Sequence, residues 1–145
     1  MNLNVVNNEA HSRGNTHPKR YRVALSIAGS DSSGGAGIQA DLKTFSSLGI
    51  YGASAITAIT AQNTVGVHSQ YALPRTVVYD QIIAVMEDLH PSVVKIGMLS
   101  NAEIANSVAD ALERYDVPIV FDPVLVSTSG HRLLSTEALD VVKRR

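Results

Sequence analysis

A glycine-rich segment, GSDSSGGAG at residues 29–37, follows an apolar run and is the first part of the sequence suited to chemistry. Glycines let backbone amides approach a ligand closely or turn with positive φ, and a helical pattern follows. The spacing is neither that of a Walker A loop, which needs Lys and then Ser or Thr, nor G-x-G-x-x-G. Two interpretations stay open: a loop that holds a ligand, or a tight strand-to-helix turn capped by Asp31 or a serine.

Other suitable side chains stand where later strands are expected to end. The amide of Gln62 has a donor and an acceptor and can pair with the ring nitrogen and exocyclic amine of a flat heterocycle. Met98 can cover an aromatic ring, and the Asp122 carboxylate can act on hydrated magnesium or orient a phosphate-bearing ligand. Each also has an ordinary explanation: a solvated strand end, a core methionine and the start of a turn.

Three further features carry less weight. The hydroxyl and backbone donors of residues 127–130 would suit phosphate oxygens or belong to a solvated loop, and Lys43 is interpreted as a surface charge. The 5 histidines, His131 among them, show no H-x-x-x-H or similar spacing, so the sequence assigns no metal ligand.

Hydrophobic periodicity predicts the elements that position these groups. Strands are expected at residues 21–28, 53–61, 92–99 and 118–124, and the turn-rich stretch 63–74 has room for a short edge strand. Three helical stripes lie between the strands. Their apolar positions are Ile38, Leu42 and Phe45; Val78, Ile82, Val85 and Leu89; and Ile104, Val108, Leu112 and Tyr115.

The expected helix boundaries follow from residue type. Gly49 ends the first helix, Pro91 closes the second, and Ser100 with Glu103 has the S-x-x-E spacing of a capping box for the third. A fourth helix is expected from near Ser135. Strands that alternate with helices imply an α/β fold, a mostly parallel sheet with helices on both faces. In such sheets ligands bind beyond the carboxyl ends of the strands, so the candidate residues should meet at one rim.

Composition narrows the class of protein. The chain has 145 residues, 45% of them hydrophobic, and a formal net charge of -1, which favours a globular domain and argues against nucleic acid or a membrane surface as partner. It has no cysteine and no apolar run of transmembrane length, which fits a cytoplasmic enzyme. Residues 1–20 lack a hydrophobic period and are expected to form a loose tail before a domain at 21–145.

Four ordered blocks resemble one known family. They are AGSDSSGGAGIQADLKTF at 28–45, ITAQNTVGV at 59–67, KIGML at 95–99 and DPVLVSTSGHRLL at 122–134. Together they resemble the hydroxymethylpyrimidine and phosphomethylpyrimidine kinases of thiamine biosynthesis, which are ribokinase-like. The resemblance implies ATP- and Mg²⁺-dependent phosphorylation of 4-amino-5-hydroxymethyl-2-methylpyrimidine and then of its monophosphate.

The resemblance also implies a pocket. Gly29, Gln62, Met98 and Val124 match the positions that form the pyrimidine site in the family. Gln62 would pair with the heterocycle edge, and Met98 and Val124 would cover its faces. Asp31 lies beside this pocket as a further substrate-binding candidate, and Asp122 is placed on the phosphate or Mg-ATP side.

One departure from the family sets the remaining expectations. Complete members continue to a G-T-G loop that supplies the anion hole, the activating residue and most ATP contacts, and no such loop follows here. We therefore expect a C-terminally truncated fold, no catalytic residue in this chain, and no turnover by the chain alone. Self-association into a homo-oligomer stays open.

Two alternatives remain beside this reading. A pyridoxal or pyridoxine kinase shares the fold and the glycine loop, although Gln62 within TAQN favours the pyrimidine. A noncatalytic pyrimidine-binding fragment would fit the missing G-T-G loop. A dinucleotide-dependent oxidoreductase is disfavoured because Gln62, not an acidic residue, follows the second strand.

Overall fold

The computed structural model describes residues 21–122 and Val124. The tail expected at 1–20, the hydroxyl segment 127–130 with the adjoining His131, and the helix expected from Ser135 lie outside these residues. The elements in chain order are β1 (Val23–Asp31), α1 (Gly37–Ser47), β2 (Tyr51–Gln62), β3 (Val67–Ala72), α2 (Arg75–Leu89), β4 (Val93–Ile96), α3 (Ala102–Leu112) and β5 (Ile119–Phe121).

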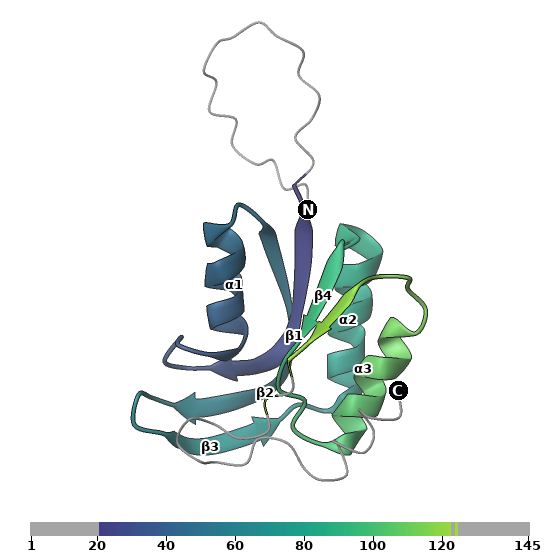
Figure 1. Cartoon of the computed structure of the whole chain (residues 1–145). Coiled ribbons are helices and arrows are strands. Elements are labelled where there is room, and N and C mark those ends of the chain that lie inside the picture. Colours follow the sequence, from purple (N-terminus) through teal and green to yellow (C-terminus); the bar gives the residue numbers. More distant parts are fainter. Residues whose placement is uncertain (1–20, 123, 125–145) are drawn as a thin grey trace, which may run out of the picture.

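The described strands form one sheet in the order β3-β2-β1-β4-β5. β1 pairs in parallel with β2 and β4, and β4 pairs in parallel with β5, whereas β3 is the antiparallel edge strand. Figure 1 shows α1 on one side of the sheet and α2 with α3 on the other. The predicted α/β fold, with a mostly parallel sheet and helices on both faces, is therefore confirmed, and the stretch 63–74 does contain an edge strand.

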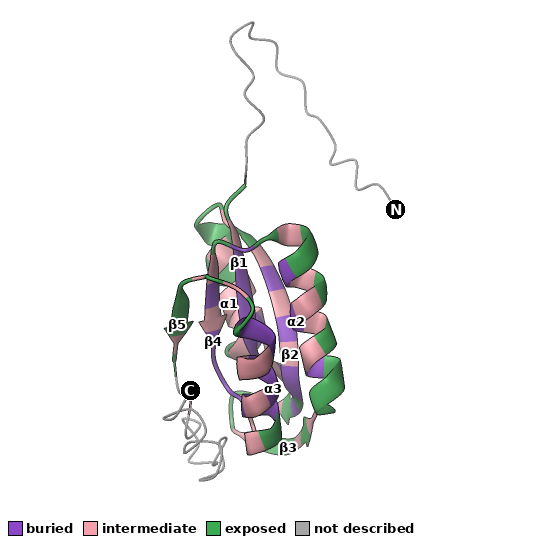
Figure 2. Cartoon of the chain, turned by 90° about the vertical axis from the view of Figure 1, so that its right-hand side faces the viewer, coloured by how far each residue is buried: buried purple, intermediate pink, exposed green. Residues whose placement is uncertain are grey.

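The main core lies between the sheet and α2 with α3. Because side chains alternate along a strand, Leu25 and Ile27 enter this core while Ser26 between them points towards α1. Full burial of such a side chain contributes about 1.5–3 kcal/mol, so the alternation fixes which face each helix covers. Figure 2 shows the buried residues concentrated in the central strands and on the helix sides that face them. The largest fully buried apolar side chains are Leu25, Ile27, Ile82, Ile104, Val78, Val94 and Val108.

Two helix ends agree with the sequence and one does not. The helix α2 ends at Leu89, with His90 as its C-cap directly before Pro91. Gly49 follows the C-cap of α1 with φ 71°, as expected of a glycine that ends a helix. The capping box predicted at Ser100 and Glu103 is wrong, because the N-cap of α3 is Asn101, whose side chain accepts the amide hydrogen of Ile104 at 2.9 Å. Ser100 precedes the cap with φ 66°.

The first strand is longer than its apolar run. β1 continues past the predicted end at residue 28 to Asp31, and Ser30 and Asp31 pair with Ile59 and Thr60 of β2 after an irregularity in the register. Polar residues here do not mark a loop, because the parallel neighbour still satisfies their backbone groups. The extension carries β1 to the edge of the sheet where the candidate residues lie.

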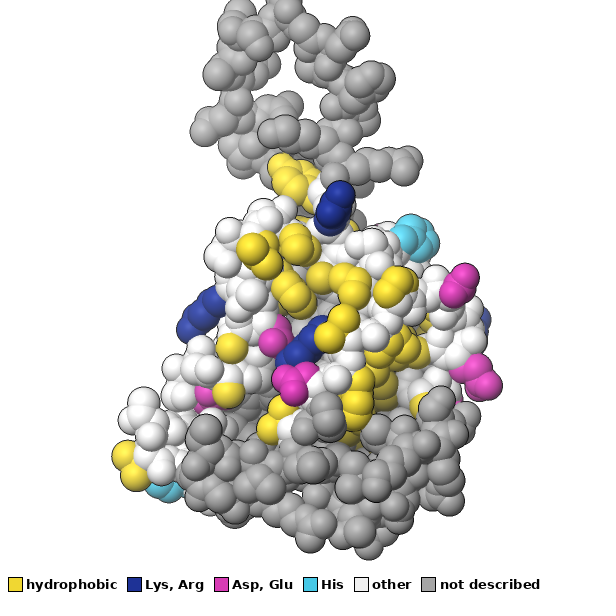
Figure 3. All heavy atoms as spheres, viewed as in Figure 1, with side chains coloured by type: hydrophobic (Ala, Val, Ile, Leu, Met, Phe, Trp, Pro, Cys, Tyr) yellow, Lys and Arg dark blue, Asp and Glu magenta, His cyan; other side chains and the backbone are white. Residues whose placement is uncertain are grey.

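Apolar side chains also reach the surface at both sheet edges. Ile119 and Val120 of β5 are 49% and 56% exposed, and Tyr71 of β3 is 65% exposed. Figure 3 shows hydrophobic side chains grouped around a cationic one on the face seen in Figure 1. Within residues 21–122, no helix combines the length and the apolar character needed to cross a membrane.

Candidate functional site

The carboxyl ends of β1, β2, β4 and β5 bring the predicted site residues to one edge of the sheet. Gly29 lies within the last part of β1, Gln62 ends β2, Met98 follows β4, and Asp122 and Val124 follow β5. Because these four strands run parallel, their carboxyl ends share one rim, as the sequence predicts.

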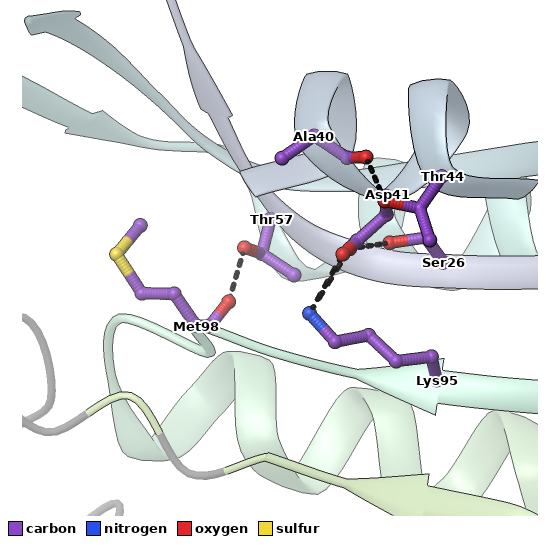
Figure 4. A network of polar contacts seen from close by, with 7 residues as sticks. All are labelled: Ser26, Ala40, Asp41, Thr44, Thr57, Lys95 and Met98. Carbon is purple, nitrogen blue, oxygen red and sulfur yellow. Dashed lines mark hydrogen bonds and ion pairs between the residues drawn. The ribbon is translucent and has the colours of Figure 1, made fainter. Parts of the chain in front are cut away.

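Met98 forms a small apolar cluster at this rim. Its side chain is 7% exposed and packs with Ala58, and Val124 packs against the pair; we call these three residues the Met98 cluster. A Cβ at Gly29 would lie 2.5 Å from the Met98 methyl carbon, so the methyl group occupies the space that glycine leaves. The Thr57 hydroxyl donates to the Met98 carbonyl at 2.6 Å and fixes this backbone (Figure 4). Three of the predicted pocket residues are thus in one place.

Gln62 is held at the same rim through its main chain. Its main-chain amide donates to the Ser32 hydroxyl at 2.8 Å, and that hydroxyl donates back to the main-chain carbonyl of Gln62 at 2.7 Å. The side-chain oxygen of Gln62 accepts a long hydrogen bond of 3.3 Å from Thr60. The segment that starts at Gly29 therefore reaches both parts of the site, since Gly29 borders Met98 and Ser32 binds Gln62.

Glycine conformation shapes the segment that joins β1 to α1, here called the glycine loop (residues 32–36). Gly34 has φ 77° and Gly37, the first residue of α1, has φ 56°. A Cβ at Gly37 would overlap the carbonyl oxygen of Gly29, so only glycine fits there. The positive φ expected of the glycines is therefore confirmed at Gly34 and Gly37, whereas close approach to a ligand stays a prediction.

The Asp31 carboxylate organises the glycine loop. The residue is 3% exposed, and its oxygens accept hydrogen bonds of 2.8–3.0 Å from the Ser33 amide and hydroxyl and from the amides of Gly35 and Ala36. Burial raises the pKa of Asp31, but the hydrogen bonds from Ser33, Ala36 and Gly35 outweigh it and hold the pKa below its ordinary value. A carboxylate has about four acceptor sites, so these donors occupy it. The geometry shows the turn held by Asp31 that the sequence allowed, and a substrate contact by Asp31 stays a prediction.

Two side chains of α1 complete the loop, and the sequence reasoning missed both. The Gln39 amide accepts from the Asp31 backbone at 2.8 Å and donates to the Ser30 hydroxyl at 2.7 Å. Lys43 is exposed, as expected of a surface charge, and its Nζ also donates to the Gly34 carbonyl at 2.7 Å, a contact that was not predicted. The signal was available: Gln39 and Lys43 lie four residues apart on one helix face, next to the loop.

An ion pair ties α1 to the sheet behind this loop. Lys95 of β4 lies 3.0 Å from the Asp41 carboxylate of α1, which also accepts a 2.6 Å hydrogen bond from Ser26 (Figure 4). Lys95 and Ser26 are direct partners in the β1–β4 register. Their side chains converge on Asp41 because both point to the α1 face.

Asp122 lies at the end of β5 with its side chain exposed, and its amide donates to the Ile96 carbonyl at 2.9 Å. Across residues 21–122 there is no group of three or more His, Asp or Glu side chains able to hold a metal. Mg²⁺ at phosphoryl-transfer sites binds through one or two carboxylates and the substrate phosphates, so a single exposed carboxylate fits that mode in part.

Solved structures with the same arrangement define the class of protein. A crystal structure of phosphomethylpyrimidine kinase from Clostridium difficile 630 superposes with a TM-score of 0.77 at 54% identity, covering 83% of this chain and 53% of that one. Pyridoxal kinase from Staphylococcus aureus in complex with AMP-PCP gives a TM-score of 0.73 at 34% identity, covering 86% and 45%. The chain therefore has the α/β fold of the ribokinase-like kinases.

Sequence comparison makes the assignment more specific. The model of the family "Phosphomethylpyrimidine kinase" matches residues 31–145, and the chain belongs to that family. Hydroxymethylpyrimidine/phosphomethylpyrimidine kinase of Rhizobium meliloti (strain 1021) is 57% identical over 117 residues, which are 81% of this chain and 44% of the relative. The Bacillus subtilis (strain 168) relative is 50% identical over 121 residues, which are 83% of this chain and 45% of the relative. The chain spans about half the length of these curated relatives.

Proposed function

We propose that this chain supplies the pyrimidine-binding part of an ATP-dependent kinase of thiamine biosynthesis. The substrates would be 4-amino-5-hydroxymethyl-2-methylpyrimidine and then its monophosphate. The observation that carries the proposal is the convergence of Gly29, Met98 and Val124 at the rim where Gln62 ends β2. The proposal is supported by about 50% identity to kinases named for these two pyrimidines.

The chemistry of the rim suits a flat heterocycle with one polar edge. The Met98 cluster offers a polarizable surface to a ring face, while the Gln62 amide offers a donor and an acceptor to ring nitrogen and exocyclic amine. One neutral hydrogen bond contributes only about 0.5–1.5 kcal/mol net. Gln62 therefore acts mainly by rejecting analogues that leave its amide unpaired.

ATP would supply the phosphoryl group, and Mg²⁺ would neutralise charge on its phosphates. Among the described residues, Asp122 is our candidate for that side of the site, since it is exposed at the same rim. We place residues 21–145 in one kinase domain and the enzyme in the cytoplasm. Assembly into a homo-oligomer is left to a measurement of mass in solution.

Pyridoxal is the second candidate substrate. It is favoured by the similarity to Staphylococcus aureus pyridoxal kinase in complex with pyridoxal, at 39% identity and a TM-score of 0.66. The higher identity to the pyrimidine kinases, 48–57%, ranks pyridoxal behind the pyrimidine.

The test is equilibrium binding to the purified chain by isothermal titration calorimetry, with hydroxymethylpyrimidine and pyridoxal as ligands. We expect tighter binding of the pyrimidine, and Gln62→Ala should weaken it by about 10-fold, because the site then lacks its polar pairing group. Glu113→Gln is the control, since it changes an exposed residue after α3, at the end opposite the rim. Equal affinity for both ligands, or an unchanged affinity in Gln62→Ala, would overturn the assignment.

The same comparison extends to catalysis. ADP release with ATP, Mg²⁺ and each ligand reports phosphoryl transfer separately from binding. Pyrimidine-dependent ADP release, reduced by Gln62→Ala and not by Glu113→Gln, is the expected pattern for the protein that contains this chain. ADP release with pyridoxal but not with hydroxymethylpyrimidine would establish the second candidate instead.

A further inference from the structure

We propose that Ser32 is a positioning residue that sets the place of the Gln62 side chain and thereby contributes to the choice of pyrimidine. The inference rests on the proposed function of Gln62. It concerns a residue that makes no ligand contact in the proposal and acts only through the backbone of another residue.

The bonding of Ser32 is directed at one residue far away in the sequence. Its hydroxyl accepts from the Gln62 amide at 2.8 Å and donates to the Gln62 carbonyl at 2.7 Å. Both polar groups of the Gln62 main chain thus bind the same hydroxyl, across 30 residues of sequence. A hydroxyl has one donor and can accept in addition, so it can satisfy both partners at once.

The two hydrogen bonds between Ser32 and Gln62, here called the clasp, lie just beyond the point where β1 stops pairing with β2. The pairing of β1 with β2 ends at Asp31 and Thr60, two residues before Gln62. On the other side, the pairing with β3 is irregular between Ala61 and Gln62. Gln62 still pairs with Val67 of β3, but on the side that faced β1 the position of its backbone depends on the hydroxyl that bridges its main-chain amide and carbonyl.

Ser32 can serve as an anchor because the loop around it is itself fixed. The preceding residue, Asp31, holds the amides of Ser33, Gly35 and Ala36 through its buried carboxylate. From α1, Lys43 donates to the glycine loop at 2.7 Å. The Ser32 hydroxyl therefore transmits the geometry of a rigid loop to the end of β2.

Loss of the hydroxyl should change selectivity more than folding. Ser32 is exposed, so water can bond to the freed backbone groups of Gln62 in a Ser32→Ala variant. The side-chain amide of Gln62 would then lose its fixed alignment with the heterocycle edge. Pairing with the exocyclic amine would weaken, whereas contact between the ring faces and the Met98 cluster would persist.

The experiment compares two ligands across five forms of the chain and one control variant. The ligands are hydroxymethylpyrimidine and its analogue without the 4-amino group, and calorimetry gives both affinities. The forms are wild type, Ser32→Ala, Ser32→Thr, Gln62→Ala and the double variant of Ser32→Ala with Gln62→Ala. Ser46→Ala, an exposed serine near the far end of α1, is the matched control.

We expect Ser32→Ala to weaken binding of the amino ligand by about 3- to 10-fold, the range of one hydrogen bond, and to leave the analogue within about 2-fold. Ser32→Thr, which keeps a hydroxyl, should restore the preference. In the Gln62→Ala background, Ser32→Ala should have no further effect on the preference. Equal losses for both ligands, or additive losses in the double variant, would show a merely structural role and overturn the inference.

A second readout needs no ligand. Hydrogen exchange at the Gln62 amide should speed up in Ser32→Ala and stay unchanged in Ser46→Ala, because the amide loses its acceptor in the first variant alone. An unchanged exchange rate would show that the Ser32 hydroxyl does not protect the main-chain amide of Gln62, and it would refute the inference. Failure of the proposed function is recognised separately, since wild type would then not prefer the amino ligand although the exchange effect remained.

Discussion

Replacing Asp31 by asparagine should destabilise the fold at neutral pH. The amide keeps one oxygen, so its NH2 group must face at least one of the donors that now point at the carboxylate, namely Ser33, Gly35 and Ala36. One hydrogen bond to a charged acceptor, worth about 1.5–3 kcal/mol, is lost, and the others become neutral and weaker. Ser33 and Gly35 are exposed, so water compensates part of the loss, and we expect about 2 kcal/mol less free energy of unfolding.

The loss should depend on pH. The hydrogen bonds hold the pKa of Asp31 below its ordinary value in the folded state. The unfolded chain therefore binds the proton first as the pH falls, and the stabilisation is complete only above the unfolded pKa, about 4. The stability difference between wild type and Asp31→Asn should be full at neutral pH and should shrink as the pH falls below about 4, through the pKa of the folded state.

Urea unfolding followed by circular dichroism, at neutral pH and at about pH 3.5, measures both effects. Asp88→Asn, which alters an exposed carboxylate near the end of α2, is the control and should change stability by less than about 0.5 kcal/mol. An equally small change for Asp31→Asn at neutral pH, or a difference that does not narrow in acid, would refute the assignment of the carboxylate as the centre of the loop.

Two further predictions concern the attachment of α1. Gly37→Ala should lower the free energy of unfolding by more than about 3 kcal/mol in urea titration, because its Cβ meets the Gly29 carbonyl at φ 56°; Gly49→Ala, with φ 71° and open space, should lose only about 1 kcal/mol. Asp41→Asn should cost about 1–3 kcal/mol, because Lys95 loses its charged partner while 21% exposed, and adding Lys95→Met should recover part of that loss. Similar losses for the two glycines, or full additivity for the ion pair, would contradict these readings.

Much of the fold could be read from the sequence because hydrophobic periodicity reports burial directly. The stripes at Val78 and Ile82 and at Ile104 and Val108 do form the sides of α2 and α3 that face the core. The end of β1 could not be read in this way. Asp31 looks like a turn residue by type, and it belongs to the strand only because β2 lies beside it.

The functional site, like the fold, could be predicted from the sequence only in part. The convergence of Gly29 and Met98 followed from strand order, since parallel strands end at one rim. The clasp between Ser32 and Gln62 spans 30 residues, and no local pattern indicates it. Likewise, the spacing of Gln39 and Lys43 places both on one face of α1, but whether that face meets the loop depends on how α1 packs against the sheet.

The most direct test of the pyrimidine site is methyl NMR of the chain labelled with 13C at its methionine methyl groups. Met98 lies in the proposed pocket, whereas Met86 is buried in the main core on α2 and serves as an internal control. Titration with hydroxymethylpyrimidine should shift the Met98 methyl resonance in a saturable manner and leave Met86 in place. An unmoved Met98 resonance at a ligand concentration that calorimetry shows to be saturating would contradict the proposed site.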